Sequence, residues 1–554
     1  QNGLILNMDE NLFAPGFQDA ADGHLIVRNP QLKEYKNLPS HLDVFPFFII
    51  GFVASLFSAG SREIFIASDF IFPPLAFLML FVVARKLFSL KKELAALTAL
   101  LIVLFQSFTN FLLALITLNI QYFNFFSATD FLGYSKLYAP EFIVIPFLAA
   151  LVVLYEALRK DSMKYAIAAS LLGALLFYTY IYYSTFFWGT FAIMALIELY
   201  RKRNFRTVKK LVAISVPAAV LAIPYIMNFI ALSRSEAYRD TLLRVGLETS
   251  RFIHITIIYA FVSLVVLAIA YHVMVRKDRF TFLFVASMLL TATILMNIQV
   301  IMGYSVQPWH WGYRILEFLY FLIAAYVIQT GLTSGRKNID NISSKIFSFL
   351  NNKIVIKALI VVFVIYGLGY SISAASATGD IYKLTEGEAD TYRWLNNNTP
   401  GDSAVMTLSL KESLHIPSFT HNNVYLPDGI TSGRTTEELV DRFVFAHALY
   451  NATDALSEKL NVNNDALRLE YINKLYDGAR FGLRDFEKYY FINYFFHTQF
   501  FYGLHEYQQK NPDIPGTIGF YFPLAFRKTV MQKLSSGSYK RYDLDYVVVG
   551  PYER

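Results

Sequence analysis

The stretch at residues 354–380, IVIKALIVVFVIYGLGYSISAASATGD, contains the change in composition that decides the fold. Its first part, 354–374, is an apolar run long enough to cross a bilayer, which takes about 20 residues. A linker of small and polar residues follows at 375–380, and no spanning run occurs after it. The stretch therefore predicts the last membrane span and the start of a separate soluble domain.

Nine further apolar runs precede this span, at 64–84, 93–118, 141–159, 163–181, 183–200, 208–230, 252–275, 280–302 and 314–333. The chain of 554 residues is 55% hydrophobic and has a mean hydropathy of +0.40, more apolar surface than one soluble core of this length needs. The sequence predicts a polytopic α-helical membrane protein with a C-terminal soluble α/β domain.

Basic residues gather in alternate loops between the runs. The loops 85–92, 159–164, 201–210, 276–279 and 336–353 are rich in Lys and Arg, which places them on the cytoplasmic side. The loops 119–140 and 303–313 are poor in basic residues and are expected on the other side, together with the C-terminal domain. The loop 231–251, which carries Arg234, Arg239 and Arg244, is a mild exception.

The run 44–59 is 16 residues long and contains Pro46 and Gly51. It is either a short span or a helix in the membrane interface, and its length favours the interface. The expected domains are therefore a non-cytoplasmic loop with a juxtamembrane helix at 1–63, a transmembrane region at 64–374 and a non-cytoplasmic soluble domain at 375–554.

Within the soluble domain, 388–396 and 437–450 are predicted to be helices, and 404–408 and 546–549 to be buried strands. The absence of Cys excludes disulfides, thiolate metal sites and Cys nucleophiles. The net charge of +7 lies mostly in the loops, so membrane topology explains it better than a nucleic-acid partner.

Asp9 and Glu10 are the first candidates for chemistry. A carboxylate at a membrane surface can take a proton from an acceptor hydroxyl or hold a divalent cation. Asp19 and Asp22 follow in the same segment and could assist. The alternative is an ordinary solvated loop, which residue spacing alone favours.

The loop at 127–141 supplies a second candidate, because it places Asp130, Tyr134, Lys136 and Glu141 before a span. Glu141 next to Pro140 suits the first turn of a helix, which is the structural explanation of that acid. Asp130 and Lys136 have no such explanation.

His310 and Arg314, in 307–314, form a third candidate at the start of a span. They are four residues apart, so a helix would place both on one face, where they could hold a phosphate. Arg314 could equally be an interfacial anchor, and Glu317 could pair with it. Asp69, inside the first run and before Pro73 and Pro74, is a second-rank candidate because intramembrane acids are costly.

The arrangement resembles the C-type (GT-C) superfamily of membrane glycosyltransferases. In that family a first span is followed by an outer loop with a catalytic Asp and juxtamembrane helices, which Asp9 and the run 44–59 match. The stretches 127–141 and 307–314 are similar to its second acidic site and its lipid-phosphate site. The family's first span would then lie upstream of Gln1, giving eleven spans.

The resemblance implies transfer of a sugar from a polyprenyl-phosphate donor, in the membrane lipid, to a glycan, lipid or protein acceptor on the non-cytoplasmic face. It implies that Asp9, with Glu10, is catalytic, and that a divalent cation, Mg or Mn, would be held by Asp9, Asp130 and Glu141. His310, Arg314, Lys136 and Tyr134 would bind the lipid phosphate. Two rival functions are a lipid or solute transporter, whose charged path these spans lack, and a non-catalytic membrane scaffold.

Overall fold

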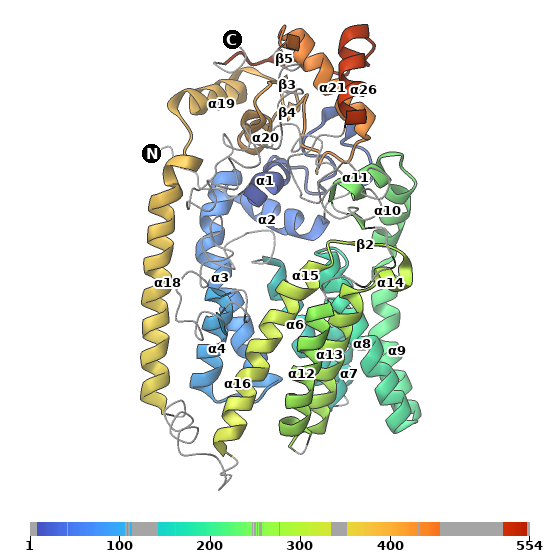
Figure 1. Cartoon of the computed structure of the whole chain (residues 1–554), viewed down its shortest axis with the longest axis vertical. Helices are drawn as coiled ribbons and strands as arrows, with labels where there is room; N and C mark the ends of the chain where they lie inside the picture. The colour runs from blue at the N-terminus through green and yellow to red at the C-terminus, as the bar shows by residue number, and fades with distance from the viewer. Residues whose placement is uncertain are drawn as a thin grey trace.

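The computed structural model describes residues 8–40, 43–105, 142–160, 162–245, 257–275, 277–333, 352–429, 431–454 and 524–550, with a few residues between these ranges. A bundle of long helices forms the lower part of the molecule and a smaller domain of helices and short strands the upper part (Figure 1). This agrees with the predicted fold class of a helical membrane region and a C-terminal α/β domain. The predicted linker at 375–380 is wrong, because the last long helix, Lys353–Tyr382, continues through it.

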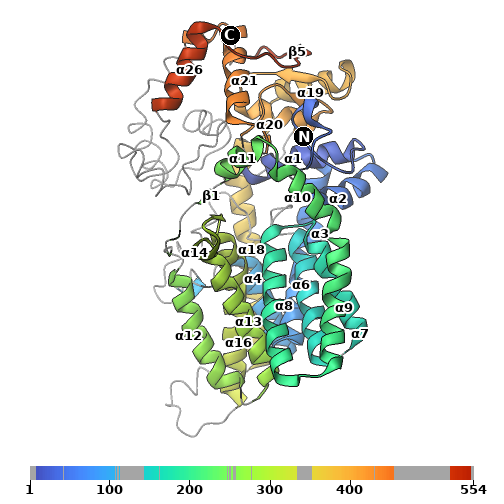
Figure 2. The same cartoon turned by 90° about the vertical axis from the view of Figure 1, so that its right-hand side faces the viewer.

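Each of the ten predicted apolar runs contains a helix. In chain order these are α3 (Ser61–Lys86), α4 (Lys92–Leu104), α6 (Ile143–Lys160), α7 (Met163–Leu176), α8 (Ile181–Lys202), α9 (Phe205–Leu221) with α10 (Ile223–Ser233), α12 (Ile257–Met274), α13 (Arg279–Met296), α16 (Glu317–Thr333) and α18 (Lys353–Tyr382). The helices stand side by side in the bundle (Figures 1 and 2). The hydropathy pattern therefore predicted the helices of the membrane region.

Among the described residues, four helices are long and apolar enough to cross a membrane by length and composition alone. They are Ser61–Lys86, Ile181–Lys202, Arg279–Met296 and Trp309–Thr330. The pair α9 and α10, bent by 50° where they meet, passes the same test together and counts as a fifth if the two form one span. Pro224 in the first turn of α10 accounts for this bend, because proline cannot continue the hydrogen-bond ladder.

The described ends of the basic loops lie at the end of the bundle opposite the C-terminal domain, where α3, α6, α8 and α12 end and α4, α7, α9, α13 and α18 begin (Figure 1). An ion pair of 3.1 Å joins Arg159, at the end of α6, to Asp278 before α13. A second pair, Lys353 with Glu93 at 3.8 Å, joins α18 to α4. The described parts of these loops thus share one end, as the alternating charges predicted.

The predicted juxtamembrane helix is α2 (Val44–Leu56), of 13 residues. At 1.5 Å per residue it is roughly 20 Å long, less than the bilayer core of about 30 Å. It lies under α1 (Met8–Ala21), across the end of the bundle that carries the soluble domain (Figure 1). A Cβ added at Gly51 of α2 would come within 2.3 Å of the Ala20 Cβ, so a glycine is needed for these two helices to touch.

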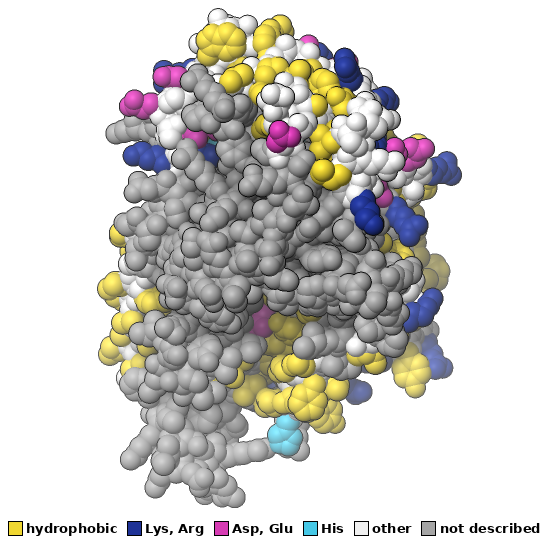
Figure 3. All heavy atoms as spheres, turned by 45° about the horizontal axis from the view of Figure 1, so that its top comes forward, with side chains coloured by type: hydrophobic (Ala, Val, Ile, Leu, Met, Phe, Trp, Pro, Cys, Tyr) yellow, Lys and Arg dark blue, Asp and Glu magenta, His cyan; other side chains and the backbone are white. Residues whose placement is uncertain are grey.

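The soluble domain contains a three-stranded parallel sheet in the order β4-β3-β5, made by Asn423–Val424, Ala404–Met406 and Tyr546–Val547. Its described helices are α19 (Glu386–Asn398), α20 (Leu410–Phe419), α21 (Thr436–Leu449) and α26 (Leu524–Ser536). The predicted helices at 388–396 and 437–450 and the buried strand at 404–408 are confirmed in their cores. A strand also forms within 546–549, but the prediction that it is buried is wrong, since Val547 and Val549 are exposed. Charged side chains of both signs stand among hydrophobic ones over this end (Figure 3).

The N-terminal segment 29–36 is built into the soluble domain. The Val424 amide of strand β4 donates to the Gln31 carbonyl at 2.8 Å, and the Gln31 side chain donates to the buried Asp428 carboxylate at 2.5 Å. The Asn29 side chain donates to the Ser432 carbonyl at 2.7 Å. A segment near the start of the chain therefore completes the folded core of a domain near its end.

A buried ion-pair cluster extends this attachment. Arg442 of α21 is fully buried and pairs with Glu34 at 2.9 Å and with Glu438 at 3.0 Å. The Tyr35 hydroxyl donates to Glu438 at 3.0 Å. In a low-dielectric interior a guanidinium needs such partners, so the cluster ties the segment firmly to α21.

The membrane region also touches the soluble domain directly. Asp240 in α11 (Ala237–Val245) accepts a hydrogen bond of 2.7 Å from the Thr436 amide, at the first turn of α21. The Ser61 hydroxyl, at the start of α3, donates to the Ser418 carbonyl of α20. These contacts hold the soluble domain over one end of the bundle.

Candidate functional site

His310 and Arg314 lie where the chain enters α16 at the soluble-domain end of the bundle. His310 is in the single-turn helix α15 (Trp309–Trp311), and Arg314 is in one turn of π-helix, Gly312–Leu316. Such single π-turns interrupt α-helices most often at functional sites. The turn brings both basic side chains to one neighbour, Tyr180, the residue before α8.

Tyr180 contacts both members of the predicted pair. Its hydroxyl is hydrogen-bonded to His310 Nδ1, and its ring lies 5.5 Å from the Arg314 guanidinium carbon. The two basic residues therefore share one face, as their spacing of four residues predicted. Their predicted role in holding a phosphate is not tested by this geometry alone.

Aromatic rings surround the pair. Tyr182 lies 4.5 Å from the His310 ring, centroid to centroid, and Tyr313 lies 5.2 Å from it. The Tyr313 ring is also 5.2 Å from the Arg314 guanidinium carbon, and its hydroxyl accepts a hydrogen bond of 3.3 Å from Arg314 Nε. These are cation–π distances, so the rings stabilise the guanidinium without neutralising it.

Arg314 has an unused donor. Its Nη1 atom is buried and has no hydrogen-bond partner in the described part of the chain. Among the described residues, no ion pair joins Arg314 to an Asp or Glu. The pairing with Glu317 that the sequence allowed is therefore not seen, although Glu317 is buried one turn further along. A guanidinium offers five N–H donors, and an open one in a buried place is suited to an anionic oxygen.

The loop that presents the pair is held in place by backbone contacts. The Tyr182 hydroxyl donates to the Val306 carbonyl at 2.9 Å, and the Trp311 indole donates to the Tyr182 carbonyl at 3.1 Å. Gln307 has a φ of 42°, a left-handed conformation that is uncommon for a residue other than glycine. Strain of this kind concentrates at sites whose surroundings fix the backbone.

The tyrosines were missed at the sequence level. The signal was present in the run 177–183, FYTYIYY, where four Tyr stand at the tight turn between two spans. Aromatic residues are expected at a membrane interface for structural reasons. That explanation gave no reason to expect a contact between these tyrosines and His310 or Arg314.

The first candidate acids lie on α1 rather than in a loop. Asp9 and Glu10 are in the first turn of this helix, so the alternative of an ordinary solvated loop around these acids is wrong for residues 8–21. The Glu10 side chain is buried. The Asp9 side chain lies outside the described residues, so its predicted approach to His310 and Arg314 stays a prediction.

A chain of contacts connects α1 to the basic pair. Helix α1 packs on α2, and the Phe45 amide at the start of α2 donates to the Tyr178 carbonyl at 2.9 Å. Tyr178 is two residues from Tyr180, which contacts both His310 and Arg314. The acid-bearing helix and the basic pair therefore occupy the same end of the bundle (Figure 1).

Asp130, Tyr134, Lys136 and Glu141, the members of the second candidate, lie outside the described residues. Their predicted roles in lipid-phosphate and metal binding stay predictions.

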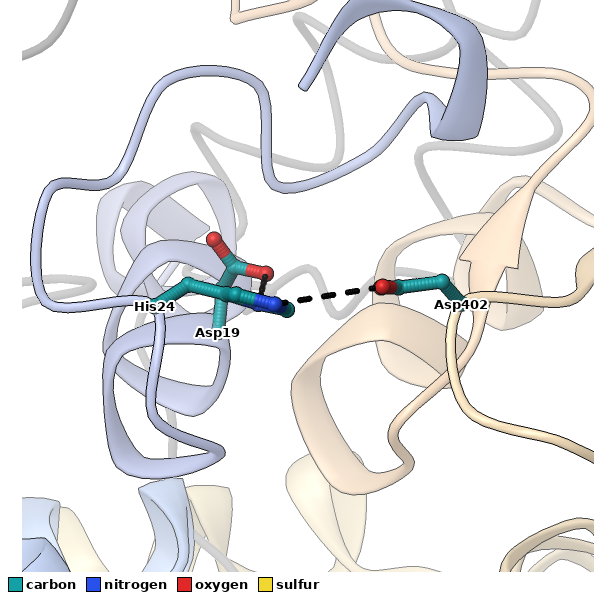
Figure 4. Close-up of side chains that lie close together, drawn as sticks. All are labelled: Asp19, His24 and Asp402. Carbon is teal, nitrogen blue, oxygen red and sulfur yellow. Dashed lines mark hydrogen bonds and ion pairs between the residues drawn. The ribbon is translucent and has the colours of Figure 1, made fainter. Parts of the chain in front are cut away.

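A different polar cluster joins α1 to the soluble domain. Asp19, His24 and Asp402 place one ligand-type atom each within 4.8 Å of one another (Figure 4). His24 Nδ1 is 2.9 Å from the Asp19 carboxylate, and its Nε2 is 3.9 Å from that of Asp402. The ammonium of Lys36 lies 2.5 Å from both carboxylates. The positive charge that two facing carboxylates require is thus supplied by the chain itself.

The electrostatics of this cluster follow from its pairs. The hydrogen bond to Asp19 raises the pKa of His24 above its ordinary value. Burial acts to lower the pKa of Lys36, but Asp19 and Asp402 outweigh it and the pKa is raised. Burial raises the pKa of the neighbouring Asp22 to about 6. The cluster was missed at the sequence level, because Asp402 is separated from the other members by more than 360 residues.

Comparisons with known proteins give a likeness of fold. No protein-family model matches the chain, and no curated protein matches it in sequence. Three structures of the oligosaccharyltransferase of Archaeoglobus fulgidus are similar to it, each with a TM-score of 0.38. They are a complex with Zn and sulfate (14% identity), a complex with an inhibitory peptide and a dolichol-phosphate (13%), and a form tethered to an acceptor peptide with the NVT sequon (16%).

The matched regions cover 76%, 76% and 81% of this chain and 58%, 60% and 64% of those chains, respectively. The chain thus spans about three fifths of the length of the structures that it matches. Identity and TM-score at this level assign no activity. On the evidence of its own helices and sheet, the chain is a polytopic α-helical membrane protein with a soluble α/β domain towards its C-terminus.

Proposed function

We propose that the protein is a membrane glycosyltransferase that moves a sugar from a polyprenyl-phosphate donor to an acceptor on the non-cytoplasmic face. The observation that carries the proposal is the open, buried donor of Arg314 beside His310, at the membrane end that faces the soluble domain. A lipid phosphate brings negative charge to this depth, and a guanidinium is the side chain best suited to bind it.

In the proposed reaction, a nucleophilic atom of the acceptor attacks the anomeric carbon and the bond from that carbon to the phosphate oxygen breaks. The bond electrons leave with the lipid phosphate, where Arg314 and His310 offset the growing charge. The carboxylate of Asp9, on the first turn of α1, takes the proton of the acceptor with the help of Glu10.

The tyrosine rings affect which group can bind Arg314. They stabilise the Arg314 charge through their faces but provide no anion that would compete with the phosphate. The open donor of Arg314 therefore stays available to an incoming anionic group. Tyr134 and Lys136 are proposed to contact the same phosphate. A divalent cation on Asp9, Asp130 and Glu141 is part of the proposal, but no step is assigned to it.

The test uses the full-length protein in lipid nanodiscs with a panel of radiolabelled polyprenyl-phosphate sugars. Replacing Arg314 by Gln is expected to lower turnover of the accepted donor by about 10²-fold, the effect of removing one stabilising donor from a transition state. Arg314→Lys, which keeps the charge, should retain part of the activity. Asp9→Asn should abolish transfer while leaving expression and folding intact.

Arg203→Gln is the matched control, since Arg203 stands exposed at the basic end of α8. Full turnover in Arg314→Gln would overturn the assigned role of the pair. Consumption of none of the donors would overturn the glycosyltransferase itself and favour a scaffold. Movement of the intact lipid between leaflets would favour a transporter.

A further inference from the structure

Tyr180 is placed to control the chemical state of His310. Its hydroxyl is hydrogen-bonded to His310 Nδ1, and the two rings lie 5.9 Å apart, centroid to centroid. Tyr180 is only 7% exposed, and in the described part of the chain its hydroxyl has no other hydrogen-bond partner. The direction of this one hydrogen bond therefore determines which nitrogen of the imidazole carries a hydrogen.

The direction follows from the needs of the buried hydroxyl. If Nδ1 carried a hydrogen and donated it, the phenolic hydrogen would have no acceptor among the described residues, which is costly in a buried place. If the phenol donates to a bare Nδ1, its hydrogen is satisfied and the ring hydrogen stands on Nε2. The second arrangement leaves no unmet donor, so it assigns Nδ1 of His310 as the acceptor.

The charge of Arg314 favours the same state. Its guanidinium carbon lies 5.5 Å from the Tyr180 ring and 5.2 Å from the Tyr313 ring, and the His310 ring lies 5.2 Å from that same Tyr313 ring. A second positive charge close to a guanidinium is disfavoured, most of all where water is excluded. The site therefore favours a neutral imidazole over an imidazolium.

Tyr180 is ordered by the start of α8. Its carbonyl accepts from the Tyr183 and Ser184 amides at 3.0 and 3.1 Å, in the first turn of that helix. Its ring packs against the rings of Tyr182 and Tyr183, at centroid distances of 4.9 and 5.3 Å. A long helix therefore fixes the position from which the hydroxyl reaches His310.

We propose that Tyr180 is a positioning residue that holds His310 as the neutral tautomer with its hydrogen on Nε2. The inference rests on the proposed binding of a lipid phosphate by His310 and Arg314. His310 then donates a hydrogen bond from Nε2 to a phosphate oxygen, and Arg314 supplies the positive charge. The other neutral tautomer would present a lone pair at Nε2 and repel the same oxygen.

The first measurement detects the tautomer in the absence of any donor substrate. The full-length protein with isotopically labelled histidine is studied in lipid nanodiscs at pH 7.5 by solid-state NMR, because ring nitrogens with and without a hydrogen differ in chemical shift. The chain has ten His, and the signals that disappear in His310→Gln belong to His310. A bare Nδ1 and a protonated Nε2 are expected. A hydrogen on Nδ1, or on both nitrogens, would overturn the proposal.

Tyr180→Phe keeps the ring beside Arg314 and removes only the hydroxyl. It should move the His310 Nδ1 signal, because the bare nitrogen loses its donor. Tyr178→Phe is the matched control, since the Tyr178 hydroxyl donates to the Leu221 carbonyl at 2.7 Å, and it should leave the His310 signals in place. The signals of the other histidines show whether each variant keeps its fold. Unchanged His310 signals in a folded Tyr180→Phe would overturn the proposal.

Turnover of the accepted sugar donor then tests the positioning role. Tyr180→Phe is expected to lower kcat/KM about fivefold, the effect of one ordinary hydrogen bond. In a His310→Gln background the imidazole is absent, so adding Tyr180→Phe should cause no further loss. A further fivefold loss in that background would mean that Tyr180 acts on the substrate directly, and would overturn the role. Because the tautomer is measured without a donor, failure of this inference is distinguishable from failure of the proposed glycosyltransferase activity.

Discussion

At the scale of single residues, the cluster of Asp19, His24, Lys36 and Asp402 determines how firmly α1 is attached to the soluble domain. The carboxylates of Asp19 and Asp402, from distant parts of the chain, both pair with the Lys36 ammonium. The His24 imidazole contacts both carboxylates (Figure 4). Because His24 donates to Asp19 most strongly when it is protonated, the attachment depends on pH.

The pKa of folded His24 is raised above its ordinary value of 6.5, so the stabilisation is fully present below about pH 6.5 and is lost as pH rises through the folded pKa. We expect the unfolding temperature to fall over this range, by an amount worth well under about 1 kcal/mol, since the His24 side chain is 47% exposed. Differential scanning fluorimetry between pH 5.5 and 8.5 measures it. His24→Gln should flatten this fall and His272→Gln should not; parallel curves for all three proteins would contradict the assignment.

Which of these residues the sequence could predict depends on how local their partners are. The spacing of His310 and Arg314 is a property of one helix, so their shared face was predictable. Their contact with Tyr180, 130 residues from His310, was not. Asp19 and Asp22 were singled out as acids, but the sequence contains no pattern that pairs Asp19 with Asp402.

At the scale of elements, the close contact of α1 and α2 depends on Gly51. We expect Gly51→Val to force the two helices apart, since even the first carbon of a side chain would overlap Ala20. Overpacking of this kind costs about 1–3 kcal/mol. Thermal unfolding followed by tryptophan and tyrosine fluorescence should show the loss.

Gly369 in α18 provides the control, because an added Cβ there meets nothing within 4 Å. Gly369→Val should leave the unfolding temperature close to that of the unaltered protein. Equal effects at the two glycines would mean that the α1–α2 contact contributes no special stability.

The long helices were predictable because each has to be apolar over its whole length to stay in lipid. The short elements could not be predicted in this way. Helix α1 contains Asp, Glu, Pro and Gly, a composition that fits a loop equally well, and it is ordered by α2 and by the soluble domain. The π-turn before α16 has no sequence signature, since it is a local adjustment to packing around Tyr180.

At the scale of the whole molecule, the N-terminal segment 29–36 is hydrogen-bonded to the soluble domain and continuous with α1 and α2, so we expect the two regions to unfold as one cooperative unit. We expect Gln31→Ala to destabilise both, because it leaves the fully buried Asp428 carboxylate without the Gln31 amide. A lost partner of a buried charged group costs about 3 kcal/mol. A single thermal transition, shifted to lower temperature, is the expected result.

Limited chymotrypsin digestion of the same variant should cleave the soluble domain and α1 at similar rates. Asn37→Ala, at an exposed position just after the segment, is the control. Two separate transitions, with the membrane region unaffected, would show instead that the soluble domain unfolds alone.

The attachment of 29–36 also sets an order of events during synthesis. Asn29 and its partner Ser432 are 403 residues apart, so at 5–20 residues per second the segment leaves the ribosome roughly 20–80 s before the chain that receives it. During that interval the polar side chains of Asn29 and Gln31 have only water or another protein to bind. A nascent chain interrupted between residues 382 and 424 would therefore carry the described bundle while segment 29–36 still lacks its partners Val424, Asp428 and Ser432, a form that quality-control proteases can recognise.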